Sequence, residues 1–192
     1  MPDTLEKIAQ EVAQCKKCPL HEKAQNPVPG EGNPKTEIMF VGEGPGQKED
    51  DQGRPFVGAA GKFLEEMLDH IGLKRTDVFI GNVVKHRPPN NRDPEENEIL
   101  TCVPYLERQL AIIQPLVVAT LGRHSLNYFL PGEKISAVHG QPKKIITPNL
   151  DVYVILPLYH PAAALYQGSQ REIHISDFKK IPKIIEKIKK EK

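Results

Sequence analysis

Four short apolar runs rich in β-branched residues place the strongest limit on how this chain can fold. They are EIMFV at 37–41, VFIGNVV at 78–84, LVVATL at 116–121 and VYVIL at 152–156. Each run is apolar throughout, which is typical of a strand covered on both faces, as in a parallel sheet. Segments of helical period at 60–72 and 94–114 follow the first two runs, so the order predicts an α/β fold with right-handed crossovers.

The length of the chain limits the number of domains. With 192 residues, 39% of them hydrophobic, the chain can build one well-buried core but hardly two. We therefore expect a single domain over 1–192. Within it we expect an N-terminal helix and C-x-x-C arm at 1–36, a core at 37–181 and a basic helix end at 182–192. The lysine-rich helix predicted at 179–192 is expected to be a solvated outer face.

Composition excludes several classes of protein. The sequence has no apolar stretch long enough to span a membrane, and residues 1–14 lack the apolar segment of a signal peptide, so we expect a cytoplasmic protein. The net charge of +1 gives no overall basic field of the kind that marks many nucleic-acid-binding proteins. The many Pro, Lys and Ile residues are compatible with a thermophilic source.

The chain has three cysteines, two of them in the CKKC motif at Cys15 and Cys18 and the third at Cys102. An odd number with one C-x-x-C disfavours a disulfide framework. Metal binding, redox chemistry and simple burial remain as explanations.

The loops that follow the four runs are unusual. They read GEGPGQKED, KHRPPNNRDP, GRHS and YHPAAALY. Because the carboxyl ends of parallel strands line the ligand crevice of an open sheet, we expect all four loops to meet at one edge. GEGPG is not a dinucleotide fingerprint, since Gln47 stands where a third glycine or alanine is needed and Asn82 where an acidic residue is needed.

Individual residues in these loops suggest chemistry. Glu43 is a candidate acid, base or water anchor, or else an exposed turn carboxylate. Phe56 suits base stacking, or else packs in a small satellite core. The amide of Asn82, inside an apolar strand, must find partners and could read the edge of a nucleobase. His160, fixed by Pro161, could donate to a carbonyl oxygen that gains negative charge.

Taken together and in order, GEGPG, GRPFVGAAGK, NVVK.RPPNNRDP, LGRHS and YHPAAAL closely resemble the family 4 uracil-DNA glycosylases, the iron–sulfur members of the uracil-DNA glycosylase superfamily. The resemblance runs from the C-x-x-C motif to about residue 180. It implies a three-layer α/β/α fold around a central four-stranded parallel sheet. It also implies an enzyme that flips uracil out of DNA and hydrolyses the N-glycosidic bond, leaving an abasic site.

The resemblance also implies roles for residues. Glu43 would lie near the catalytic water, Phe56 would stack on uracil, Asn82 would read its polar edge and His160 would donate to uracil O2. The remaining implied contacts are to uracil from Gly42, Gly44 and Gly46, and to DNA from Pro161, Leu165, Tyr166 and Arg171. The implied substrate is single- or double-stranded DNA. We expect a monomer, and a partner such as a sliding clamp is left open.

The same resemblance implies a [4Fe–4S] cluster held by four cysteines. Cys15, Cys18 and Cys102 match three of these positions, and His86 stands at the remaining one. Histidine is an accepted cluster ligand, as in Rieske centres. Three alternatives stay open: a cluster with three Cys and one His ligand, a site that lacks one iron or holds zinc, and no metal at all.

Two other functions are weighed against uracil excision. A superfamily relative with altered base specificity would carry an extra basic loop after the second strand, whereas RPPNNRDP is short here. A catalytically weak iron–sulfur module that only binds DNA lesions would have lost the reactive side chains, whereas Glu43, Asn82 and His160 are all present. Both are therefore disfavoured.

Overall fold

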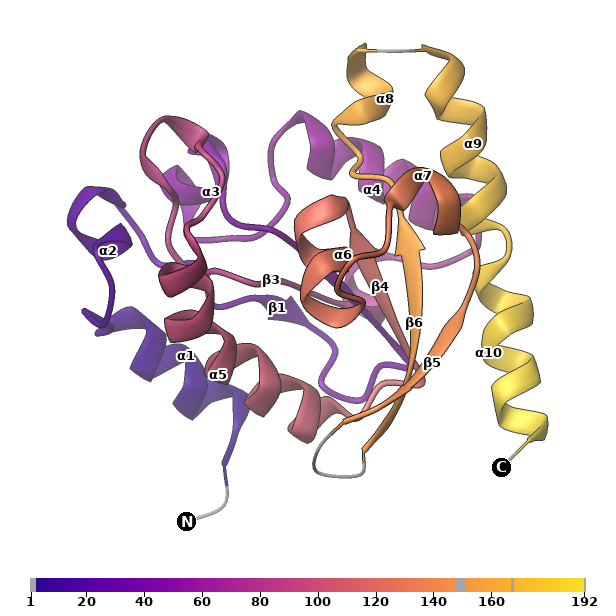
Figure 1. The fold of residues 1–192 in the computed structure, drawn as a ribbon, viewed down its shortest axis with the longest axis horizontal. Coiled ribbons are helices and arrows are strands. Elements are labelled where there is room, and N and C mark those ends of the chain that lie inside the picture. The colour runs from indigo at the N-terminus through magenta and orange to yellow at the C-terminus, as the bar shows by residue number, and fades with distance from the viewer. Residues whose placement is uncertain (1–2, 148–150, 167, 192) are drawn as a thin grey trace.

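The computed structural model describes residues 3–147, 151–166 and 168–191 (Figure 1). Its centre is a six-stranded sheet in the order β1-β3-β2-β4-β6-β5. The four inner strands run parallel, and they are β2 (Ile38–Gly42), β3 (Phe79–Asn82), β4 (Val117–Leu121) and β6 (Val152–Leu158). They coincide with the four apolar runs, so the predicted parallel sheet is confirmed.

Two short antiparallel strands extend this sheet beyond the four that were predicted. β1 (Glu31–Gly32) pairs with β3, and β5 (Lys143–Ile146) pairs with β6. Neither has a continuous apolar run, because an edge strand is covered on fewer sides and is often short or charged. The expected four-stranded sheet is therefore the parallel centre of a larger mixed sheet.

Helices cover both faces of the sheet and complete three layers (Figure 1). One face packs against α1 (Leu5–Ala13) and α5 (Glu96–Ile113), the other against α4 (Ala59–Asp69), α9 (Gly168–Phe178) and α10 (Ile181–Lys190). Along β2, Met39 and Val41 belong to the first core and Ile38 and Phe40 to the second. This burial on both sides explains why the strand is apolar at every position.

Short elements occupy the connections. They are α2 (Leu20–Lys23), α3 (Gln47–Gln52), the 3-10 turns at Arg75–Asp77 and Pro89–Asn91, α6 (Arg123–Phe129), α7 (Ile135–Val138) and α8 (Ala163–Tyr166). The helix predicted at 179–192 corresponds to α10, where Ile181 is buried and the lysines are exposed. None of the helices in the described ranges combines the length and apolar character needed to cross a bilayer.

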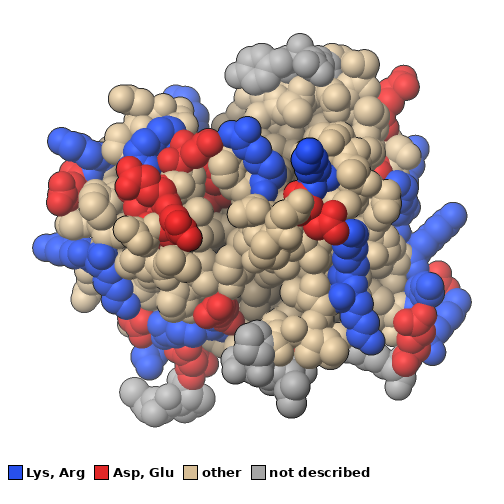
Figure 2. Space-filling model, in the orientation of Figure 1, with Lys and Arg blue, Asp and Glu red and all other residues tan. Residues whose placement is uncertain are grey.

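The charged side chains show no single dominant field. On the face seen in Figure 2, basic and acidic groups are interspersed, and neither sign covers a continuous surface. This agrees with the net charge of +1. Any anionic partner must therefore be recognised by local groups rather than by the charge of the whole molecule.

Candidate active site

A pocket of about 410 Å³ opens where the parallel strands end. Its walls come from the loops after β2, β3 and β6 and from the start of α4, so most of the loops expected to converge do so. The lining residues are Glu43, Gly44, Pro45, Gly46, Glu49, Phe56, Ala60, Asn82, Pro88, Asn91, Arg92, His160 and Ala162.

Asn82, the last residue of β3, brings an unsatisfied amide to this pocket. The residue is 1% exposed, and neither its Oδ1 nor its Nδ2 has a hydrogen-bond partner within the described part of the chain. A buried polar group without a partner costs about 1–3 kcal/mol. An amide that offers one acceptor and two donors at a pocket wall is therefore suited to a ligand that carries both kinds of group.

The GEGPG loop is tied to the segment that leaves β3. The backbone N–H of Val83 donates to the Gly42 carbonyl at 3.0 Å, and that of Val84 donates to the Glu43 carbonyl at 3.0 Å. Gly42 is required by space, since a Cβ atom there would lie 2.5 Å from Asn82 Oδ1 and 2.7 Å from Phe56 Cζ. Of the three predicted glycines, Gly44 and Gly46 line the pocket and Gly42 lies against two of its lining residues.

Glu43 projects from this loop and is half-buried. Burial is the main cause that raises the pKa of Glu43, and Asp93 raises it further, while His124 and Arg123 act in the opposite direction. A carboxylate so placed can accept a hydrogen bond from a water in the pocket, provided that it stays ionised.

Phe56 supplies an aromatic wall. It is 6% exposed, and its ring lies 5.7 Å from that of His160, at an interplanar angle of 32°. The two rings come from segments far apart in the sequence, after β2 and after β6. A flat ligand beside them would contact π surface.

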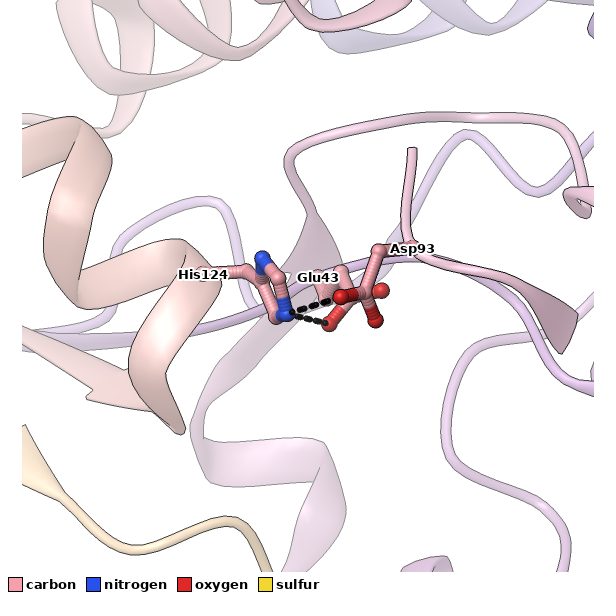
Figure 3. A group of neighbouring side chains, drawn as sticks. All are labelled: Glu43, Asp93 and His124. Carbon is pink, nitrogen blue, oxygen red and sulfur yellow. Dashed lines mark ion pairs between the residues drawn. The ribbon is translucent and has the colours of Figure 1, made fainter. Parts of the chain in front are cut away.

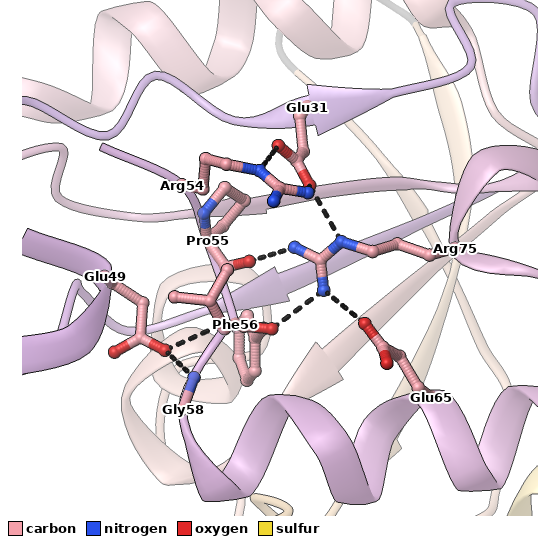
Figure 4. A network of polar contacts seen from close by, with 9 residues as sticks. Glu31, Glu49, Arg54, Pro55, Phe56, Gly58, Glu65 and Arg75 are labelled. Atoms are coloured by element: carbon pink, nitrogen blue, oxygen red, sulfur yellow. Dashed lines mark hydrogen bonds and ion pairs between the residues drawn. The ribbon is translucent and has the colours of Figure 1, made fainter. Parts of the chain in front are cut away.

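Arg75 holds the backbone of Phe56 in an unfavourable conformation (Figure 4). Phe56 has φ 50°, in the left-handed region that non-glycine residues avoid at a cost of about 1–3 kcal/mol. The guanidinium of Arg75 donates to the carbonyl oxygens of Phe56, at 2.8 Å, and of Pro55, while its Nε donates to Glu31 at 2.7 Å. These bonds fix the turn that presents the ring.

Glu49, on α3, fixes the next two residues. Its Oε1 accepts hydrogen bonds from the backbone N–H groups of Val57 and Gly58, both at 2.8 Å (Figure 4). The carboxylates of Glu49 and Glu43 thus have different partners. Glu49 is already hydrogen-bonded to the backbone, whereas Glu43 is directed to other side chains.

His160, beyond the end of β6, is held as a neutral hydrogen-bond donor. Burial first, and then the nearby His174, lower its pKa to about 4, against a smaller opposite effect of Glu49. The Ala162 N–H donates to His160 Nδ1 at 3.2 Å, so in the neutral ring the proton belongs on Nε2. A pocket-lining Nε2–H can donate to an oxygen without adding a charge to the ground state.

The residues predicted to contact DNA lie beyond His160. Pro161 is buried at the start of the turn, and Leu165, on α8, is 45% exposed. Arg171, on α9, pairs with Glu66 and lies over the ring of Phe63, with 4.9 Å from its Cζ to the ring centroid. The side chain of Tyr166 lies outside the described part of the chain. These DNA contacts stay predictions.

The three predicted cysteine ligands share the core between the sheet, α1 and α5. Cys102, on α5, is buried, and Cys15 and Cys18 pack against the same core. Burial is the main cause that raises the pKa of Cys102 to about 11. The Lys85 N–H donates to Cys102 Sγ at 3.2 Å, and His86 is the next residue in the chain.

The spacing of these donors bears on the kind of group they could hold. Of the residues that the structure describes, one set of three His, Cys, Asp or Glu has donor atoms all within 4.8 Å, and it contains no cysteine. Zinc–sulfur bonds of about 2.3 Å require ligands closer together than the cysteines are. A four-iron cluster is larger than one ion and fits the wider arrangement better.

Sequence reasoning missed several residues of the pocket. Glu49, Asn91 and Arg92 line it, and Asp93 and His124 contact Glu43 or its neighbours. All five lie in the loops or motifs named from the sequence, Glu49 in GEGPGQKED and the others in RPPNNRDP and LGRHS. The motifs therefore marked the region, but nothing in their spacing said which side chains face the pocket.

Comparison with known proteins agrees with this geometry. Residues 29–189 match the model of the uracil DNA glycosylase superfamily. A type-4 uracil-DNA glycosylase of Sulfurisphaera tokodaii is 56% identical over 93% of this chain and 84% of its own length. Another, of Thermotoga maritima, is 43% identical over 96% of both chains. The chain therefore belongs to the uracil DNA glycosylase superfamily and groups there with type-4 members.

Proposed function

We propose that this chain removes uracil from DNA by hydrolysing the N-glycosidic bond, which releases free uracil and leaves an abasic site. The buried, unpartnered amide of Asn82 carries the proposal. One edge of uracil offers an N–H donor beside carbonyl acceptors, which complements a carboxamide. Binding would satisfy polar atoms that are otherwise buried at a cost.

His160 and Phe56 serve the departing base in this proposal. As the glycosidic bond lengthens, uracil gains negative charge on its oxygens. A fixed Nε2–H from His160 stabilises that charge without reorganisation. The ring of Phe56 supplies stacking on the base, worth about 1–3 kcal/mol.

Glu43 serves the sugar side. Bond breaking gives the sugar oxocarbenium character, and a water held by an ionised carboxylate is then placed to attack it. Glu43 lines the same pocket as His160 and Asn82, so one bound nucleotide can reach all three side chains. No lysine side chain lines this pocket in the described residues, which favours water as the nucleophile.

The target nucleotide has to leave the base stack to enter the pocket. Flipping costs a few kcal/mol and is cheapest for a mismatched or single-stranded base. Leu165, exposed on the helix that follows His160, is suited to fill the vacated stack. Because acidic and basic side chains are interspersed on the surface, the DNA phosphates would be bound by individual basic groups rather than by a continuous basic surface.

We also propose a [4Fe–4S] cluster held by Cys15, Cys18, Cys102 and His86. The wide spacing of the donors and the amide-to-sulfur bond at Cys102 support it. When bound, such a cluster would cross-link the α1–α2 connection, the exit of β3 and α5. Because Asn82 ends β3, four residues before His86, the cross-link would steady the base-reading residue.

One assay tests the proposed function. Oligonucleotides with a single uracil, single-stranded or opposite guanine or adenine, are incubated with the purified protein, and a thymine oligonucleotide serves as the control. The expected result is free uracil and a site that breaks only after alkali. Strand cleavage without alkali, or binding without release of uracil, would contradict the proposal.

A further inference from the structure

The side chains of Glu43, His124 and Asp93 meet beside the pocket (Figure 3). His124 Nε2 lies 3.4 Å from Glu43 Oε2 and 3.2 Å from Asp93 Oδ2. Glu43 comes from the loop after β2, Asp93 from the connection before α5, and His124 from the first turn of α6. The proposed function uses Glu43 and leaves the other two without a role.

The surroundings decide which form of the imidazole fits. Arg123 Nε–H donates to His124 Nε2 at 2.8 Å, and Arg123 Nη2 donates to Asp93 Oδ2 at 2.9 Å. Nε2 is therefore an acceptor and has no proton to give to either carboxylate. His124 and Asp93 together hold the guanidinium of Arg123, whose side chain is 71% exposed, near Glu43.

We propose that His124 is a positioning residue that keeps Glu43 ionised by holding the guanidinium of Arg123 near it, while Asp93 holds the same guanidinium from the other side. The inference rests on the proposed function, in which Glu43 holds the attacking water. A buried carboxyl group favours its neutral form, and a neutral Glu43 could no longer accept the proton of that water. The positive charge of Arg123, held near Glu43 by His124, opposes this tendency.

The other charged groups around the pocket are already engaged. Glu49 accepts from two backbone N–H groups, and Arg92 is paired with Glu98 at 2.6 Å. His160 is neutral above a pH of about 4. The ionisation of Glu43 therefore depends mainly on burial, on His124 and Arg123, which favour the carboxylate, and on Asp93, which disfavours it.

A cation bound by the same three residues is the main rival. The donor atoms of Glu43, Asp93 and His124 are close enough for one, but the guanidinium of Arg123 already neutralises Asp93 at 2.9 Å. We therefore expect chelation with EDTA to leave the excision rate unchanged. A rate lost in EDTA and restored by Mg²⁺ would overturn the proposal in favour of a metal.

The decisive experiment is the pH profile of single-turnover uracil excision at saturating DNA. In His124→Ala the acid limb should move up by about one pH unit, so that the rate falls about tenfold on the acid side and recovers at higher pH. In Asp93→Asn the limb should move down, because a neighbouring negative charge is removed. The double variant should lie between them, which a merely structural role would not produce.

Controls separate this mechanism from misfolding. His70→Ala, an exposed histidine at the end of α4, should leave the profile unchanged. If His124→Ala does not fold, His124→Gln, whose amide oxygen can accept from Arg123, should shift the limb in the same direction but less, and Asp93→Asn is read by itself. DNA affinity should stay within about twofold, since phosphate contacts dominate it.

The outcomes also separate the two proposals. If the wild type releases no uracil, the proposed function is wrong. If the wild type excises uracil but the acid limb is the same in all variants, or all rates fall equally at every pH, only the role of His124 is wrong.

Discussion

The ammonium group of Lys85 donates a hydrogen bond of 2.8 Å to the backbone carbonyl of Asn82. Lys85 is 1% exposed, and its Nζ also donates to Gln109 Oε1 at 2.7 Å. Burial lowers the pKa of Lys85 to about 8. A buried cation thus supports the residue proposed to read uracil, and the backbone N–H of the same lysine reaches Cys102.

Replacing Lys85 by methionine tests this support. The change keeps the apolar stem but leaves the carbonyl of Asn82 and the amide oxygen of Gln109 without their donor. We expect a loss of about 1–3 kcal/mol in the free energy of unfolding, measured by denaturant titration, and slower excision. Lys62→Met, at an exposed position of α4, is the matched control. A Lys85→Met variant as stable and as active as the wild type would contradict the supporting role.

Asn82→Ala should lose more activity than Phe56→Ala. The first change removes the polar partner of uracil in a buried pocket, whereas the second removes stacking of about 1–3 kcal/mol. Single-turnover rates of both variants at saturating DNA measure the difference. Equal and small losses would remove Asn82 from the proposed role.

The free energy of unfolding should depend on pH because the pKa of His160 differs between the folded and unfolded protein. Its pKa is about 4 in the folded protein and near 6.5 when unfolded, so between these values the unfolded chain binds the extra proton. The contribution is complete above about pH 6.5 and is lost as the pH falls toward 4. We expect the free energy of unfolding to fall by about 2 kcal/mol more for the wild type than for His160→Asn between pH 7 and pH 5. Parallel pH dependences of the two proteins would show that His160 is not buried as a neutral ring.

The iron content of His86 variants tests the proposed cluster. The protein purified without oxygen should be brown and contain about four irons per chain. His86→Cys should keep the iron, whereas His86→Ala should lose iron and excise uracil more slowly, because the exit of β3 loses an anchor. Iron analysis and the visible absorption band measure the first effect.

His21 provides the control for that experiment. Its Nδ1 lies 2.7 Å from the carbonyl oxygen of Cys18, so it is a second candidate histidine for the fourth ligand. His21→Ala should retain the iron. If iron is lost from His21→Ala and retained in His86→Ala, the fourth ligand is His21 and the assignment of His86 is wrong.

The parallel strands could be predicted from the sequence because burial on both faces leaves a local trace. Ile38, Met39, Phe40 and Val41 are all buried, and this produces a continuous apolar run that can be recognised without the rest of the chain. The edge strands β1 and β5 leave no such trace, since one is two residues long and the other carries Lys143 and Lys144.

For the candidate site too, some features could be predicted from the sequence and others could not. From the sequence, Glu43 and His160 could be assigned to one region, because each follows an apolar run and parallel strands release their loops at one edge. Phe56 and Asn82 were added to it by the family resemblance. Only the tertiary structure decided that Arg75 fixes the turn of Phe56 and that His124 lies between Glu43 and Asp93. Those contacts join residues that are distant in the chain, and their distances depend on how the loops pack, which no local pattern of residues records.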